Sequence, residues 1–156
     1  MDVLAWLAAT PVADALKASA TLYLVVNAAH ILGIGLIVGA LVPLDLRLAG
    51  LLGKAPLDAI GPLLSRSALA GACLAVATGL CLFSVRPAEY AANPAFLAKV
   101  SLVALGLANA LLLHARPGWR KALATGIVGP GLRLQALLSL AIWPGAVLAG
   151  RWIGFI

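Results

Sequence analysis

Four long apolar runs constrain this chain more than any other feature, at about residues 18–44, 68–85, 94–114 and 131–153. A helix rises 1.5 Å per residue, so a run of about 20 apolar residues matches the ~30 Å hydrocarbon core of a bilayer. Short connections between such runs favour antiparallel neighbours. The pattern therefore predicts an all-α membrane protein, an up-down bundle of four transmembrane helices in contact with the lipid bilayer.

The composition leaves no room for a separate soluble domain. Of 156 residues, 63% are hydrophobic, so we expect residues 1–156 to form one integral membrane domain. The net charge of +6 does not indicate a nucleic-acid partner, because the basic residues stand at span ends and form no patch interleaved with aromatic residues. The sequence shows no carboxylate pair, nucleophile–base set or phosphate loop, so hydrolase and nucleotide-dependent activities have no residues to carry them.

The distribution of Lys and Arg predicts the orientation, because these residues concentrate in cytoplasmic loops. The connections after the first and third spans carry Arg47, Lys54, Arg66, Arg116, Arg120, Lys121 and Arg133. The opposite side carries Lys17, Arg86 and Arg151. For a bacterial protein this asymmetry predicts a multi-pass inner-membrane location with both termini in the periplasm.

Residues 1–17 are expected to form a short interfacial segment before the first span. Asp2 follows the initiator Met with no basic region, so a cleaved secretory signal is not expected. Thr10 is a good cap for a helix with Pro11 at its first position and Asp14 in its first turn. The segment is either a helix lying on the outer face or a simple run-in to the first span.

Small residues recur at four-residue intervals in three of the spans: Gly35 and Gly39, then Gly71, Ala75 and Gly79, then Gly106 and Ala110. Such spacing lets helix backbones approach closely in lipid, within the chain or in a homo- or hetero-oligomer. Asp45, Arg47 and Arg66 are expected to form an ion-pair cluster at the inner surface. The other polar groups expected to pack between helices are Asn109, Gln135 and Ser139.

His30 is the leading candidate for a functional residue. It lies ~15 Å deep in the first span and shares one helix face with Tyr23 and Asn27. An ionisable group at this depth is expensive and faces the bundle interior. We consider three functional roles for it: axial ligand of a heme, proton relay or transition-metal ligand. The alternative is a histidine that only makes a hydrogen bond between helices.

Three further cations stand near the outer end of the spans. Lys99 is expected to extend toward the interface, and the alternative is that it points inward beside His30. In that second arrangement Lys99, Arg86 and Arg151 would form a cationic rim that suits carboxylates such as heme propionates.

His114 is the remaining candidate ligand, at the cytoplasmic end of the third span. It lies ~14 Å deeper along the bundle axis than His30. This separation is too large for both imidazoles to ligate one heme without strain. We therefore favour an interfacial position for His114, near Arg116.

Several motifs cover nearly the whole chain. These are Asn27-x-x-His30-x-x-Gly33, the stretch at residues 45–50, Tyr90-x-x-Asn93-Pro94-x-Phe96-x-x-Lys99, Asn109 with His114, and the stretch at residues 150–154. Together they resemble a bacterial family of four-span inner-membrane proteins, a domain of unknown function. The chain is also distantly similar to HemJ-type protoporphyrinogen oxidases and to the membrane domain of CopD-type copper-resistance proteins. The first resemblance implies heme b bound through His30, with Lys99 as a functional partner.

Three functional hypotheses follow, and none decides whether the protein is an enzyme. The first is a heme b protein that transfers electrons between a periplasmic partner and a quinone, or serves as the membrane subunit of an oxidoreductase. The second is a permease for copper or another small solute, with a path lined by Tyr23, Asn27, His30 and Lys99. The third is a non-catalytic assembly or anchor subunit of a membrane complex.

Overall fold

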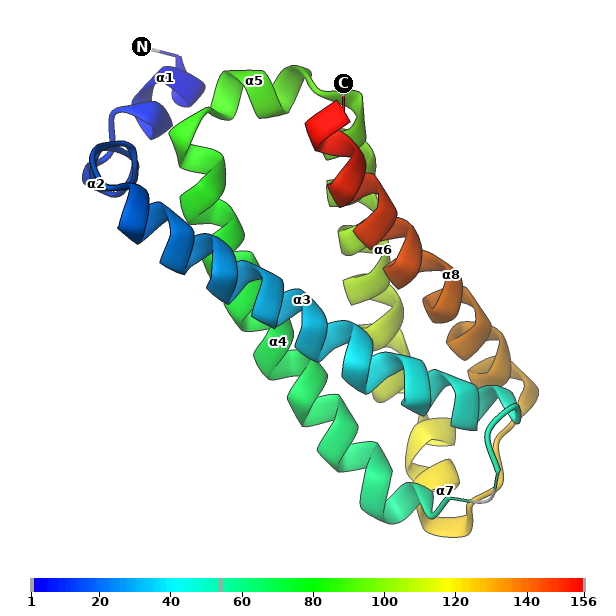
Figure 1. Ribbon diagram of the computed structural model, residues 1–156. Helices are drawn as coiled ribbons and strands as arrows, with labels where there is room; N and C mark the ends of the chain where they lie inside the picture. Colours follow the sequence, from blue (N-terminus) through cyan, green and yellow to red (C-terminus); the bar gives the residue numbers. More distant parts are fainter. Residues whose placement is uncertain (1, 54, 156) are drawn as a thin grey trace.

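A computed structural model describes residues 2–53 and 55–155, which form helices with no strand among them. Four helices are long and apolar enough to cross a membrane: α3 (Ala20–Ala49), α4 (Leu57–Val85), α6 (Pro94–Ala115) and α8 (Pro130–Trp152) (Figure 1). The predicted all-α four-helix fold is confirmed. Large apolar side chains such as Leu24, Ile31 and Leu32 are exposed on α3, as a lipid-facing surface requires.

Short helices lie before, between and after the long ones: α1 (Val3–Ala8), α2 (Pro11–Ala18), α5 (Pro87–Ala92), α7 (Pro117–Thr125) and the 3₁₀ helix η1 (Ile153–Phe155). The predicted start of α2 is confirmed, because the Thr10 hydroxyl accepts a hydrogen bond from the Ala13 amide at 3.3 Å. α5 and α7 are absent from the sequence predictions. Each begins with a proline directly after a span, a residue well suited to the first helical position.

Both termini lie at one end of the bundle, beside α1, α2 and α5 (Figure 1). We call this the terminal end. The opposite end, which holds α7 and the connection between α3 and α4, is called the loop end. An even number of spans returns the chain to the side on which it began, so α2 and α5 lie on one side of the membrane and α7 on the other.

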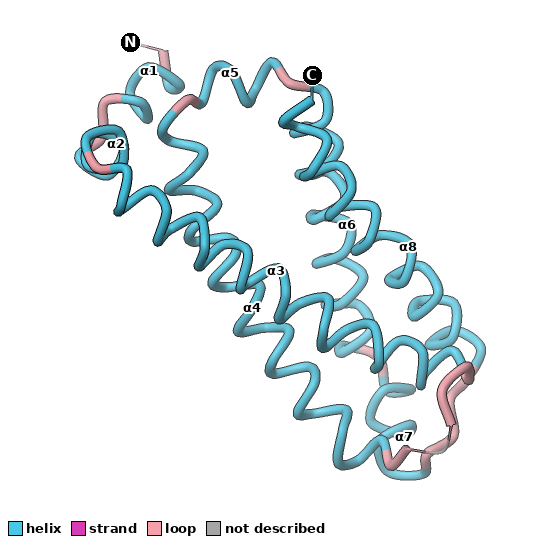
Figure 2. The backbone as a smooth tube through the Cα atoms, viewed as in Figure 1, coloured by secondary structure: helices cyan, strands magenta, loops and turns pink. Residues whose placement is uncertain are grey.

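The long helices form two hairpins. α3 packs along α4, α6 packs along α8, and contacts between α3 and α8 join the two pairs (Figure 2). At the terminal end α5 carries the chain from one pair to the other.

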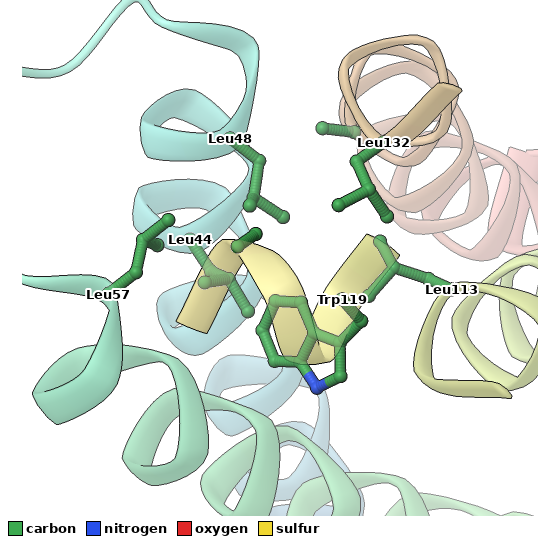
Figure 3. Close-up of a cluster of buried hydrophobic side chains, with 8 residues drawn as sticks. Leu44, Leu48, Leu57, Leu113, Trp119 and Leu132 are labelled. Carbon is green, nitrogen blue, oxygen red and sulfur yellow. The ribbon is translucent and has the colours of Figure 1, made fainter. Parts of the chain in front are cut away.

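The largest buried apolar cluster lies at the loop end (Figure 3). Trp119 of α7 is 6% exposed and packs among side chains of all four long helices: Leu44, Leu48, Leu57, Leu113, Leu132 and Ala136. Gly61 makes room for this short helix, since a Cβ there would lie 2.7 Å from Leu123 Cδ2. α7 is thus a wedge that locks the two hairpins together.

Glycine also sets the spacing of the long helices. A Cβ on Gly71 would lie 2.7 Å from the Gly33 carbonyl oxygen, and a Cβ on Gly106 would lie 2.8 Å from Trp143 Cζ2. The predicted packing faces of the second and third spans therefore lie against neighbouring helices. Within the chain the first span does not follow this prediction, because a Cβ on Gly35 or Gly39 would meet nothing within 4 Å. Gly33 lies on the packed face instead. Close approach at Gly35 and Gly39 in an oligomer stays a prediction.

The expected surface ion-pair cluster around Asp45 is also wrong. α3 continues to Ala49 and α4 begins at Leu57, so Asp45 belongs to a helix and only 4% of it is exposed. Within residues 2–53 and 55–155 it makes no ion pair. The Arg47 Nε donates to the Ala55 carbonyl at 2.8 Å, and Arg66 is exposed on α4. Lys54, which contributes to the predicted orientation, lies outside the described residues.

Candidate functional site

His30 lies on the face of α3 that packs against α4, and its Nδ1 is held by two groups of that helix. The Ala75 carbonyl oxygen is 2.9 Å from Nδ1, and the Thr78 hydroxyl oxygen is 3.1 Å from it. The Thr78 hydroxyl donates its own hydrogen to the Leu74 carbonyl at 2.6 Å, so it can only accept from the ring. Two acceptors at Nδ1 assign the proton to that nitrogen, and Nε2 therefore presents a lone pair.

The lone pair of His30 Nε2 faces Lys99 of α6, whose Nζ lies 3.4 Å away. The lysine therefore points into the bundle rather than toward the interface, which reverses our first expectation and realises the alternative. A charged Lys99 donates to Nε2, and the neutral ring accepts. This contact links the α3–α4 hairpin to the α6–α8 hairpin. We call His30, Thr78 and Lys99 the His–Lys site.

Two glycines enclose the His–Lys site. A Cβ on Gly79 of α4 would lie 3.1 Å from His30 Cε1, and a Cβ on Gly150 of α8 would lie 3.3 Å from Lys99 Cδ. A larger residue at either position would push the imidazole or the lysine stem from where it lies by a few tenths of an ångström or more. All four long helices contribute to the site.

The electrostatics of the His–Lys site are unusual for a membrane interior. Over the part of the chain that the structure describes, the ion pairs are Lys17–Asp14 and Arg86–Glu89, so Lys99 has no carboxylate counter-ion. Lys99 and His30 are both partly buried. A charged group in such a place is expensive unless it is paired or serves a function. The pair can share one proton, or hold an anion between two basic groups.

Tyr23, predicted on the same face as His30, contributes to an aromatic cluster at the terminal end. Its hydroxyl lies within hydrogen-bonding reach of the Tyr90 hydroxyl of α5. The Tyr90 ring packs 5.3 Å from the Phe96 ring, which in turn stacks 5.3 Å from Phe83. Burial, with the neighbouring Tyr23 next in importance, raises the pKa of the Tyr90 phenol above its ordinary value. The cluster adjoins the His–Lys site, because Phe96 lies one helical turn from Lys99 on α6.

The remaining predicted residues do not join the His–Lys site. Asn27 is exposed on α3, and the described residues offer it no hydrogen bond. The Arg151 guanidinium carbon lies 4.7 Å from the Phe155 ring centre, in a cation–π contact. Arg86 pairs with Glu89 at 3.4 Å. Neither arginine makes a hydrogen bond to His30 or Lys99 within residues 2–53 and 55–155, so the cationic rim of the alternative arrangement stays a prediction.

His114 lies at the loop end, as we favoured. Its Nδ1 donates to the Ala110 carbonyl at 2.8 Å, its Nε2 lies 3.0 Å from the Ser65 hydroxyl, and its ring packs 5.0 Å from the Trp119 ring. These contacts belong to the packing of α4, α6 and α7. His114 and His30 thus occupy separate layers of the bundle.

Sequence reasoning misses Thr78, Gly79 as a lining residue and Gly150. Thr78 stands in an Ala-rich span with no pattern to single it out, and its role appears only once α3 and α4 are in register. No group of three or more His, Cys, Asp or Glu able to hold a metal ion occurs among residues 2–53 and 55–155.

Comparisons with family models, with curated proteins and with solved structures find no match to this chain. The resemblances noted from the sequence stay predictions, and the His–Lys site is the feature of this chain with a clear chemical capacity.

Proposed function

We propose that this membrane protein is a permease for a small anionic solute, taken up together with a proton at the His–Lys site. The observation that carries the proposal is the 3.4 Å contact between Lys99 Nζ and His30 Nε2, in a part of the bundle with no described carboxylate partner for either group. A positive site without a counter-ion attracts an anion.

The same contact supports coupling to a proton. While the site is empty, two adjacent positive charges repel, so one of the two bases stays neutral. An anion between them offsets that repulsion, and His30 Nε2 can then take up a proton while Lys99 remains charged. Anion and proton therefore bind together, and their departure restores the starting state. The fixed hydrogen bonds at Nδ1 keep the ring oriented throughout.

Proteoliposomes with a trapped pH-sensitive dye test this proposal. External chloride, nitrate, phosphate or succinate should acidify the interior for at least one of these anions. His30→Ala and Lys99→Met should abolish the signal, and Lys17→Gln, a lysine of the exposed α2, should retain it. The proposal is wrong if none of the four anions acidifies the lumen more than in protein-free liposomes.

Heme b ligation is a second candidate function, favoured by the hydrogen bond from His30 Nδ1 to the Ala75 carbonyl. A histidine that ligates a metal donates its other ring N–H to a carbonyl, and His30 Nδ1 makes such a bond to Ala75 at 2.9 Å. Ligation through Nε2 would require Lys99 to turn aside, and the close contacts at Gly79 and Gly150 would have to open. Heme would make the protein an electron carrier to a quinone or another redox partner.

A visible spectrum separates the two functions. Protein produced with ample heme should show a Soret band that disappears in His30→Ala if heme is bound. A colourless preparation that transports anions would exclude heme binding and leave anion transport as the function.

A further inference from the structure

Asp45 lies near the loop end of α3, far from the His–Lys site. Only 4% of its surface is exposed. Fifteen residues separate it from His30 on the same helix, which corresponds to about 22 Å along the axis. Over the described residues it has no ion-pair partner. An ionised carboxylate buried here without a cation would be an uncompensated charge, which proteins avoid by pairing or by neutralisation.

Two buried polar side chains of α8, Ser139 and Gln135, belong to the same layer of the bundle, and Ser139 contacts Asp45. The Ser139 side chain is within hydrogen-bonding reach of the carboxyl group. Gln135, one helical turn from Ser139 on the same face, is also buried, with 6% exposed. The Asn109 amide of α6 donates to the Gln135 backbone carbonyl at 3.0 Å and fixes this turn of α8. Three helices thus enclose one polar layer.

Gln135 carries a second unmet demand, because its Oε1 is fully buried and has no hydrogen-bond partner. A buried acceptor without a donor is unusual in proteins. The ionised Asp45 carboxylate has no cation to compensate its charge, and Gln135 Oε1 has no hydrogen-bond donor. A proton on Asp45 removes the buried charge and adds a hydrogen-bond donor to the layer that holds Gln135 Oε1.

We propose that Asp45 is a proton-binding site of the loop-end half of the membrane. Its carboxylate takes a proton from water at the loop end and becomes a neutral carboxylic acid. The acid O–H then donates a hydrogen bond to an acceptor of this layer, Gln135 Oε1 or the Ser139 hydroxyl oxygen. Release of the proton to the same water restores the carboxylate. No other bond forms or breaks.

The charged groups of the neighbouring elements do not replace that proton. Arg47 is bonded to Ala55, and His114 of α6 is bonded to Ala110 and Ser65. The other charged side chains on the loop-end parts of α4, α7 and α8 are exposed: Asp58, Arg66, Arg120, Lys121 and Arg133. Asp45 is therefore chemically distinct from Asp58, the other acid at this end.

Infrared spectroscopy of the reconstituted full-length protein tests the site. The C=O stretch of a protonated carboxylic acid, which shifts in D₂O, should be present at neutral pH in the wild type, absent in Asp45→Asn and unchanged in Asp58→Asn. Gln135→Met removes the acceptor amide and should move the band to higher frequency. This second variant keeps the proposal testable if Asp45→Asn fails to fold.

Either of two results would overturn the proposal: no protonated carboxyl band at neutral pH, or a band that Asp45→Asn and Gln135→Met leave unaltered. Loss of the band on adding sodium chloride at constant pH would assign the layer to a monovalent cation instead. The measurement needs no transported solute. A band without anion uptake would therefore reject the permease and keep the proton site.

Discussion

Gly33 of α3 and Gly71 of α4 lie backbone to backbone, and a Cβ on either would come within 2.8 Å or 2.7 Å of an atom of the other helix. This contact is one helical turn from His30 on α3 and one turn from Ala75 on α4. It therefore sets the register that brings the imidazole to the Ala75 carbonyl and Thr78. The hydrogen bonds of His30 therefore depend on the close approach of α3 and α4 at these two glycines.

Gly33→Ala should consequently destabilise the protein by about 1–3 kcal/mol, because overpacking a tight helix contact forces the backbones apart. The matched control is Gly35→Ala, two residues away, where a Cβ meets nothing within 4 Å. The control should be neutral or stabilising by up to ~1 kcal/mol through helix propensity. Unfolding in mixed micelles measures both. Equal losses would show that the α3–α4 contact does not depend on Gly33.

The residues that sequence reasoning places correctly are those governed by local rules. The four spans follow from run length, and the start of α2 follows from Thr10 and Pro11. Gly35 and Gly39 have the expected spacing but do not face α4, because several faces of α3 carry small residues and only the partner helix decides which face packs. The loop assigned around Asp45 fails for a related reason. A helix satisfies its own backbone, so polar residues do not end it when tertiary packing buries them.

The inward direction of Lys99 also depends on information distant in the sequence. Gly150 on α8 leaves room for the lysine stem, and His30 on α3 supplies the acceptor. A local reading sees only a lysine near a span end, for which the interface is the usual destination.

Gly150→Leu tests this dependence. The added side chain would occupy the space of Lys99 Cδ and Cε and displace Nζ from His30. We expect anion-driven acidification to fall about tenfold, equivalent to ~1.4 kcal/mol. Gly39→Leu, which has open space at the Cβ position, is the control and should retain wild-type flux. A Gly150→Leu protein with normal flux would remove Lys99 from the pathway.

Trp119→Ala should destabilise the fold by about 3–5 kcal/mol, since it empties the centre of the loop-end cluster. Trp6, which is 54% exposed on α1, provides the matched substitution and should lose far less. Thermal unfolding followed by circular dichroism compares the two. A similar loss in both variants would mean that α7 does not hold the hairpins together.

Stability should decline at alkaline pH because of Tyr90. Its pKa is raised in the folded protein by burial and by Tyr23, so above the ordinary tyrosine pKa of about 10 the unfolded chain loses a proton that the native state retains. The free energy of unfolding therefore falls as pH rises from that value toward the folded pKa. Tyr90→Phe should show a shallower fall, measured as unfolding midpoint against pH. Parallel curves for the two proteins would contradict this origin.

The orientation predicted from Lys and Arg can be tested against the common end of the two termini. In a Cys73→Ala/Cys81→Ala background, a cysteine replacing exposed Ala88 of α5 reports the terminal end, and one replacing exposed Ile127 reports the loop end. In intact bacterial cells a membrane-impermeant maleimide should label the Ala88 position and spare the Ile127 position until the cells are lysed. The opposite pattern would place the basic α7 outside. Proton entry to Asp45 would then begin from the periplasm, and the sense of the proposed anion uptake would be reversed.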